Sequence, residues 1–325
     1  MTTQEFKDRL QGLVALGEDF GALVFFAIRN EDGIVLKKAN IINDVLTEIA
    51  SGYRESIQAE LNRFLQDDHM SVLNLSDRDE RENVIYRYDI PDVEPSYFAQ
   101  MREPVAEDAP EYINDRLFQF DQESFGDIDY FVVMLGTEEN HVVVYRDNFN
   151  VNLLKQARGR YYLNKSGTQI TNLKEDILRM DSQIDCMLLD DDFFIVNLKN
   201  LNTSKEFATI IKDRANQSVD LIADLEYIDN VDGLRERLDE LSFARRLMKA
   251  MDGSPVIGLP TPTVLDFVSN NPKLNNVLKV ESGKIKLDTK KAQSAFVSLL
   301  NDDFLYSKLT NNDYESSSKD RLRIM

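Results

Sequence analysis

A stretch of 27 residues, 148–174, contains no acidic side chain, although the 325-residue chain carries a net charge of −19. A phosphate site needs several cations close together without competing carboxylates, and this basic island supplies five. Its two adjacent tyrosines could also stack against unpaired bases. The candidate nucleic-acid contacts are Lys155, Arg158, Arg160, Tyr161, Tyr162, Lys165 and Lys174. The exposed side of a surface strand or short helix would explain the same cations, and tyrosines in strands are more often packing residues, so both interpretations stay open.

A second basic segment, 273–291, has six lysines against Glu281 and Asp288, a net charge of +4. Its secondary basic patch consists of Lys284, Lys286, Lys290 and Lys291. The cations of the preceding helix, Arg245, Arg246 and Lys249, are explained by the helix dipole alone. Because no known DNA-reading motif is present, any DNA contact is expected to be independent of base sequence.

One acidic constellation could do metal chemistry, namely Asp190, Asp191 and Asp192 followed by Lys199. Many magnesium-dependent nucleases place a carboxylate in one strand, then an acid and a lysine two residues apart in the next. Here Asn197 occupies the place of that acid, and a neutral amide holds a hard cation poorly. A turn built on the three aspartates is therefore favoured, and a degenerate nuclease that also uses Asp185 remains the alternative.

No other catalytic or metal-binding set is recognisable. The only histidines, His69 and His141, lack metal-ligand spacing, and Cys186 has no second cysteine as a companion. Phosphate-binding glycine loops and nucleophile-elbow serines are absent from the sequence. We therefore expect neither an enzyme nor a bound metal or cofactor.

The composition is that of a globular protein, with 42% hydrophobic and 29% charged residues. Between Asp77 and Glu139, 18 acids stand against five arginines and no lysine, a net charge of −13. This window is explained by a solvated face, or by an acidic scaffold that mimics DNA.

The apolar run 21–28 is too short to span a bilayer, the N-terminus lacks a secretory signal and the single cysteine fits a reducing compartment. We expect a cytoplasmic protein that is held at a membrane, if at all, by another chain.

The first two thirds of the chain combine strands with one long helix. Apolar residues at three- and four-residue steps predict an amphipathic helix over 41–65. Half of the eight prolines fall within 91–110, which predicts an acidic loop. Strands are predicted at 21–28 and 84–90, and hairpins at 130–135 with 141–145 and at 184–189 with 193–198.

Mostly helical patterns follow. Thr203 and Glu206 form a candidate capping box, and a longer helix is predicted from Val231 to Met248. A proline-bearing link over 255–262 leads to a small hairpin that turns at Ser282 and Gly283, and a last helix begins near Thr289. The fold class is therefore α+β: a mixed or antiparallel sheet with a long helix, then a mostly helical part. We place an α+β domain at 1–199 and a mainly helical domain with a small hairpin at 200–325, with 255–262 as an equally fair boundary.

The second hairpin and its surroundings resemble a known family. The apolar run 184–189, the aspartate turn, the run 193–197 and the helix containing Glu206 and Phe207 look like the core of the KwaB family. The likeness extends over about 125–315 through Arg245 and Arg246, the Ser-Gly hairpin, the segment 299–302, Leu309, Thr310 and Tyr314. These are patterns of hydrophobicity and turns rather than catalytic signatures.

KwaB proteins are the soluble subunits of the Kiwa anti-phage defence system. The resemblance implies an effector that binds phage DNA and blocks its replication, without an established catalytic centre. It also implies a homodimer, in the cytoplasm and peripherally at the inner membrane, docked on the integral-membrane subunit KwaA. The resemblance supplies no residue-level DNA contacts.

Overall fold

The computed structural model describes residues 1–30, 33–75, 83–90, 94–106, 116–119, 121–148, 153–154, 163–166, 169–172, 176–203, 205–252, 254–307 and 312–315. Contacts divide the chain into two compact units whose main boundary lies between Leu201 and Asn202. The described residues 74, 75, 89, 90 and 94 group with the second unit. That residues 1–199 and 200–325 are separate domains remains a prediction.

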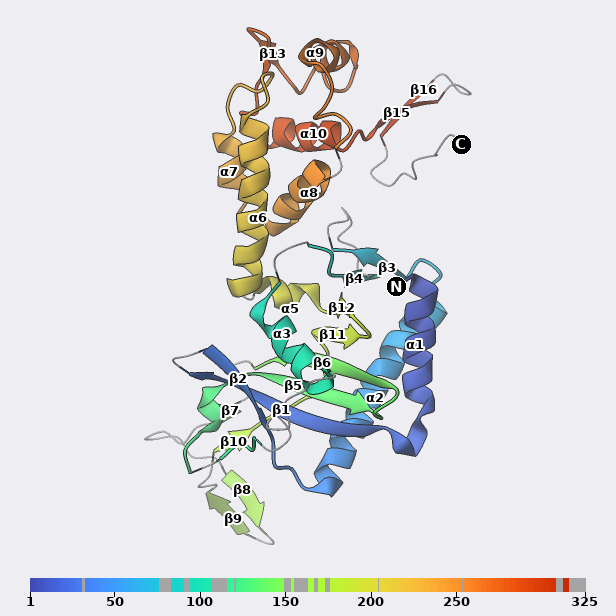
Figure 1. Cartoon of the computed structure of the whole chain (residues 1–325), viewed down its shortest axis with the longest axis vertical. Coiled ribbons are helices and arrows are strands. Elements are labelled where there is room, and N and C mark those ends of the chain that lie inside the picture. Colours follow the sequence, from blue (N-terminus) through green and yellow to red (C-terminus); the bar gives the residue numbers. More distant parts are fainter. Residues whose placement is uncertain are drawn as a thin grey trace. The chain divides into compact units, whose positions relative to one another are not determined.

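An eight-stranded sheet forms the centre of the first unit (Figure 1). The pairings that run from β2 through β1, β5, β6, β11 and β12 to β4 are antiparallel. The two predicted hairpins form adjacent pairs in it, because short turns join neighbouring apolar strands. The strands, in sheet order, are β2 (Gly33–Lys38), β1 (Gly21–Asn30), β5 (Ile128–Gly136), β6 (His141–Asp147), β11 (Cys186–Leu189), β12 (Asp192–Ile195), β4 (Val84–Arg87) and β3 (Ser71–Asn74).

Helices cover both faces of this sheet. On one face α1 (Thr3–Ala15) and α2 (Asn43–Gln66) bury Phe6 and Phe64 against Phe194 and the inward side chains of β1 and β5. On the other face α3 (Ser96–Arg102) stacks Phe98 on Phe193, with ring centroids 3.7 Å apart. The alternation of side chains along each strand supplies apolar residues to both layers.

The first unit also contains two small strand pairs and several 3₁₀ turns. One small pair joins β7 (Leu153–Leu154) to β10 (Ile177–Leu178), and another joins β8 (Leu163–Ser166) to β9 (Gln169–Asn172). Single 3₁₀ turns occupy Gly17–Asp19, Glu103–Val105 and Phe125–Asp127.

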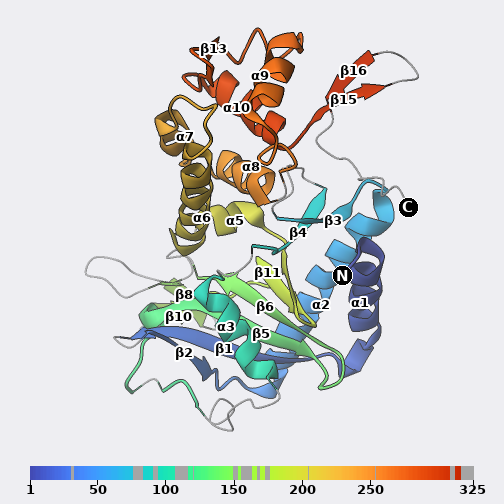
Figure 2. The same ribbon diagram turned by 45° about the horizontal axis from the view of Figure 1, so that its top comes forward.

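The second unit is mainly helical (Figure 2). The long helix α6 packs on α8, and α8 in turn packs on α10. The turn of the hairpin β13–β14 places Ser282 and Gly283 at positive φ, 53° and 76°. Its elements are α6 (Lys205–Ala223), α7 (Asp232–Arg237), α8 (Leu241–Asp252), α9 (Thr261–Asn270), β13 (Val280–Glu281), β14 (Lys284–Ile285), α10 (Lys290–Leu300), β15 (Phe304–Ser307) and β16 (Asn312–Glu315), with α5 (Leu198–Thr203) at the boundary.

The α+β class is confirmed, and three local predictions are corrected. The proline-rich segment 91–110 contains the helix α3, which Pro95 precedes as N-cap. The predicted helix from Val231 to Met248 is two helices, because i→i−3 bonds from Leu238 to Arg235 and from Glu240 to Arg237 close the end of α7. The link after Pro255 contains α9, with a proline in its first turn.

Candidate functional site

Most of the basic island lies outside the described residues, namely Lys155, Arg158, Arg160, Tyr161, Tyr162 and Lys174. The backbone of Lys165 lies in β8, where Lys165 is opposite Ile170 of β9. The island as a nucleic-acid site therefore stays a prediction.

Two lysines of the secondary basic patch are neutralised within the second unit. Lys286 Nζ lies 3.3 Å from a carboxylate oxygen of Asp229 and 3.3 Å from one of Glu281, and these hydrogen bonds raise its pKa. Lys290 pairs with Glu240, and hydrogen bonds from Lys290 and Arg237 lower the pKa of Glu240 to about 2. These two lysines therefore carry structural ion pairs.

Lys284 and Lys291 are exposed and form no ion pair with any described residue. Lys284 lies on the small hairpin, and Lys291 stands in the first turn of α10. That turn has no acidic residue, so Lys291 adds positive charge where the helix dipole is already positive. Such a position favours a negatively charged ligand.

Lys291 borders a cavity of about 210 Å³ in the second unit, which we name the cationic pocket. Three cations from three separate segments and two serine hydroxyl groups line it together with apolar side chains, and no acid is among the described residues of its lining. The lining residues are Arg246, Lys273, Leu274, Val277, Lys291, Ser294, Ala295, Ser298 and Phe304.

Local structure fixes each wall of this pocket. Lys291, Ser294 and Ser298 share one face of α10 because they are three and four residues apart. The N-cap hydroxyl group of Thr289 accepts a hydrogen bond from the amide of Ala292 at 3.1 Å and anchors the start of that helix. After α9, the side-chain oxygen of Asn271 accepts a hydrogen bond from the amide of Lys273 at 3.0 Å, which holds the turn that carries this lysine.

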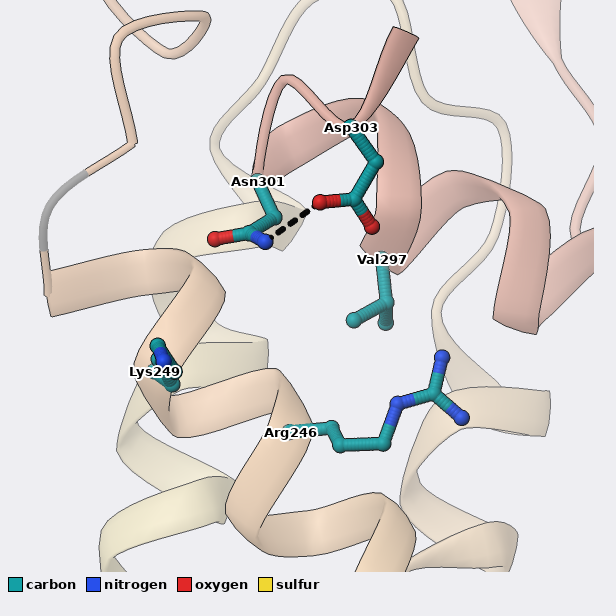
Figure 3. Close-up of a pocket in the computed structure, with 5 residues that line it drawn as sticks. All are labelled: Arg246, Lys249, Val297, Asn301 and Asp303. Atoms are coloured by element: carbon teal, nitrogen blue, oxygen red, sulfur yellow. Dashed lines mark hydrogen bonds between the residues drawn. The ribbon is translucent and has the colours of Figure 1, made fainter. Parts of the chain in front are cut away.

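Arg246 also borders a smaller neighbouring cavity, shown in Figure 3. Arg246 and Lys249 project from α8, while Val297 belongs to α10. Beyond the end of α10, Asn301 donates a hydrogen bond of 2.5 Å to Asp303, whose side chain is buried. The described lining of both cavities thus holds four cations and one acid.

The acids of the suspected metal site do not form one cluster. Asp185 is fully buried, and both of its carboxylate oxygens accept hydrogen bonds from Arg146, at 3.0 and 3.2 Å. Asp190 pairs with Arg9 at 2.9 Å, and Asp192 pairs with the amino group of Met1 at 3.0 Å. Among the described residues no group of three or more potential ligands is placed to hold a metal ion. A metal at Asp185, Asp190 or Asp192 would compete with a cation that is already paired with that carboxylate.

The three aspartates at 190–192 lie at the turn between β11 and β12, as the favoured interpretation predicts. Asp190 has a φ of 53°, in the left-handed region that aspartate tolerates in turns, and β12 begins at Asp192. Lys199 is exposed in α5. Cys186 lies wholly buried in β11, and burial raises the pKa of its thiol, which disfavours the reactive thiolate.

The acidic window is partly neutralised where the structure describes it. Glu123 pairs with Lys37, and Asp129 pairs with Arg29 at 2.5 Å. Within the described part of the chain, no helix is long and apolar enough to cross a membrane.

Sequence reasoning missed the cationic pocket as a unit. It placed Lys291 in a basic patch and assigned Arg246 to the helix dipole, and Lys273 entered only as the start of the basic segment. The missing information is that α8, the turn after α9 and α10 meet around one cavity.

Comparison with known proteins identifies the family. Residues 125–310 match the family model described as Kiwa protein KwaB-like. The Kiwa protein KwaB of Escherichia coli O55:H7 (strain RM12579 / EPEC) is 29% identical over 331 residues, covering 99% of both chains. No solved structure matches the chain. The chain therefore belongs to the KwaB-like family of Kiwa proteins, a membership that implies a role in anti-phage defence within a system of more than one subunit.

Proposed function

We propose that this chain is a defence effector that binds DNA through its phosphate groups at the cationic pocket and thereby obstructs replication of phage DNA. The observation that carries the proposal is a cavity whose described lining holds Arg246, Lys273 and Lys291 and no acid, in a chain of net charge −19. A polyanion is repelled by such a chain as a whole, so binding requires a local concentration of cations.

The chemistry of the pocket suits a phosphate group. Arg246 offers a planar set of N–H donors, and the two lysines act as point charges. The hydroxyl groups of Ser294 and Ser298 add uncharged donors. None of these groups reads base edges in a known motif, so binding is expected to be independent of sequence. The basic island of residues 148–174 is proposed as a second contact along the DNA.

The remaining parts of the proposal concern assembly. We propose that the chain acts as a homodimer in the cytoplasm and is held at the inner membrane by the integral-membrane subunit KwaA. Family membership supports a multi-subunit system. We also propose binding without cleavage, because three acids of the suspected metal site, Asp185, Asp190 and Asp192, are already paired with cations.

Binding of labelled single- and double-stranded DNA across a salt series tests the phosphate site. Replacing Lys273 and Lys291 together by glutamine should lower the affinity and reduce the slope of log K against log salt by about 0.7 to 0.9 for each phosphate group that the protein no longer neutralises. Both side chains are exposed, so the variant should fold normally.

Two matched variants serve as controls. Lys279→Gln removes an exposed cation of the same segment that does not line the pocket, and Lys290→Gln removes the neighbour that is neutralised by Glu240. If the double variant keeps the wild-type salt slope, or the controls change it equally, the pocket is not the DNA site. Cleavage of DNA in the magnesium-containing arm would instead favour the nuclease alternative.

A further inference from the structure

A second cavity, of about 360 Å³, lies in the first unit between α2 and the segment just before β11. We name it the acidic pocket, because the described residues of its lining include two carboxylates and no cation. The remaining lining is an apolar wall, a tyrosine and a serine. The lining residues are Val45, Glu48, Ile49, Gly52, Tyr53, Met180, Asp181 and Ser182. Its size and its mixture of apolar walls with a few polar groups are typical of ligand sites.

The walls are held by close contacts between α2 and the segment containing Ser182. The hydroxyl groups of Ser56 and Ser182 are 3.2 Å apart. A Cβ atom at Gly52 would lie 3.3 Å from the Cβ atom of Ser182, so the helix backbone approaches this segment closely. The pocket is therefore a built feature of the first unit.

The charge behind this pocket is negative. Arg146, with a side chain only 6% exposed, is shared between Asp181 and Asp185, so the three groups together carry one negative charge. The Asp181 oxygens accept hydrogen bonds from Arg146 at 2.9 and 3.0 Å. The positive charge of Arg179 also acts on Asp181 and lowers its pKa, which offsets that negative charge. Glu48 is exposed, forms no ion pair with a described residue and leaves one negative charge in excess. A cationic ligand group would balance this excess.

Tyr53, a residue of the pocket lining, carries a polar atom that is not used elsewhere among the described residues. Its side chain is 1% exposed, and its buried hydroxyl group has no hydrogen-bond partner among the described residues. Buried polar groups are nearly always paired, because an unpaired one costs about 1 to 3 kcal/mol. An ammonium or guanidinium N–H that enters the pocket could donate to this oxygen.

The apolar surface continues beyond the pocket along α2. Val45 and Ile49 are four residues apart and share one face of the helix, and Ile42 precedes them as its N-cap residue. Ile42 is 70% exposed and Val45 39% exposed. A free amine would leave this stripe uncovered, whereas a protein segment with apolar residues beside a cation would cover it.

We propose that the acidic pocket receives an arginine or lysine side chain of a partner protein, whose neighbouring apolar residues pack on Ile42 and Val45. The cation pairs with the Glu48 carboxylate and donates to the Tyr53 hydroxyl group, which Asp181 keeps in a negative field. This docking site lies in the first unit and is independent of the proposed phosphate site.

The probe is a dye-labelled peptide with one arginine between two leucines, followed by fluorescence anisotropy with the full chain. The same peptide with citrulline in place of arginine keeps the shape and loses the charge, and it should bind about tenfold more weakly, as expected for one charged hydrogen bond. Equal binding of the two peptides, or no binding of the arginine peptide, overturns the proposal.

Two variants on one helix separate the pocket from general electrostatics. Glu48→Lys should weaken binding of the arginine peptide by at least about tenfold. Glu55→Lys makes the same change of charge on an exposed residue of α2 that does not line the pocket, and should leave binding unchanged. If both variants lose the same affinity for the arginine peptide, the loss reflects the net charge of the protein and not the pocket. Displacement of the peptide by arginine amide at an equal concentration would assign the pocket to a small amine and exclude the protein segment.

Discussion

The cationic pocket draws its charge from three separate segments, whereas the acidic pocket combines the exposed Glu48 with a network around one buried arginine. Lys291 is exposed and has no ion-pair partner among the described residues. By contrast, Asp181 and Asp185 are held by Arg146 through four hydrogen bonds. Charges that remain in water cost little to keep unpaired, but buried charges must be paired. We infer that changes in the cationic pocket mainly affect binding, and that changes behind the acidic pocket mainly affect stability.

The largest effect is expected when the buried arginine is removed. Arg146→Met leaves Asp185 buried with an uncompensated charge, so the free energy of unfolding should fall by about 3 to 5 kcal/mol. Urea unfolding followed by circular dichroism measures this loss. Arg29→Met removes the exposed pair with Asp129 and should cost about 0 to 1 kcal/mol. Similar losses for the two variants would contradict the contrast between buried and exposed charge.

The register of the sheet explains why this network was not visible in the sequence. Tyr145 of β6 lies opposite Cys186 of β11, so Arg146 and Asp185 become neighbours across two strands. The strands themselves were predictable, because their apolar runs and turn residues are local signals. Which strand pairs with which, and in what register, depends on contacts across the whole chain.

The helices also were predictable where their signals are local in the sequence. α2 was predicted from its apolar period, and α10 from the start signal at Thr289. α1 carries a full capping box, Thr2 with Glu5, a local signal that was present and overlooked. The cationic pocket needed Lys273 and Lys291 to meet Arg246 from elsewhere in the fold, which no local pattern encodes.

Acid titration should resolve two neighbouring carboxyl groups with opposite effects on stability. Burial opposes ionisation of Asp181, but hydrogen bonds from Arg146 and Gln183 outweigh it and lower its pKa below the ordinary 3.8. Its contribution to stability is therefore present above about pH 4 and is lost as the pH falls through the folded-state pKa. Asp181→Asn should be less stable than the wild type at pH 7 and should approach it at low pH.

Asp147 shows the reverse behaviour. Burial, followed by the charge of Asp185, raises its pKa, so its ionised form disfavours the folded state at neutral pH. Asp147→Asn should raise the free energy of unfolding at pH 7 by less than about 1 kcal/mol, and this gain should vanish in acid. Urea unfolding at several pH values measures both differences. Parallel curves for Asp181→Asn and Asp147→Asn would show that Arg146 does not distinguish the two carboxyl groups.

The smallest effect on stability is expected when a buried tyrosine hydroxyl group is removed, and this change tests whether the Tyr53 hydroxyl group binds a ligand. Tyr53 and Tyr227 both have buried hydroxyl groups without a hydrogen-bond partner among the described residues, and only Tyr53 lines the acidic pocket. Replacing either by phenylalanine removes an unpaired polar atom, so the unfolding free energy should stay the same or rise by up to about 1 kcal/mol.

Thermal unfolding and peptide anisotropy are measured on both variants. Only Tyr53→Phe should weaken binding of the arginine peptide, because of these two tyrosines only Tyr53 lines the acidic pocket. If both variants bind the peptide as the wild type does, the Tyr53 hydroxyl group takes no part in the docking site, and the cation must be held by carboxylates alone.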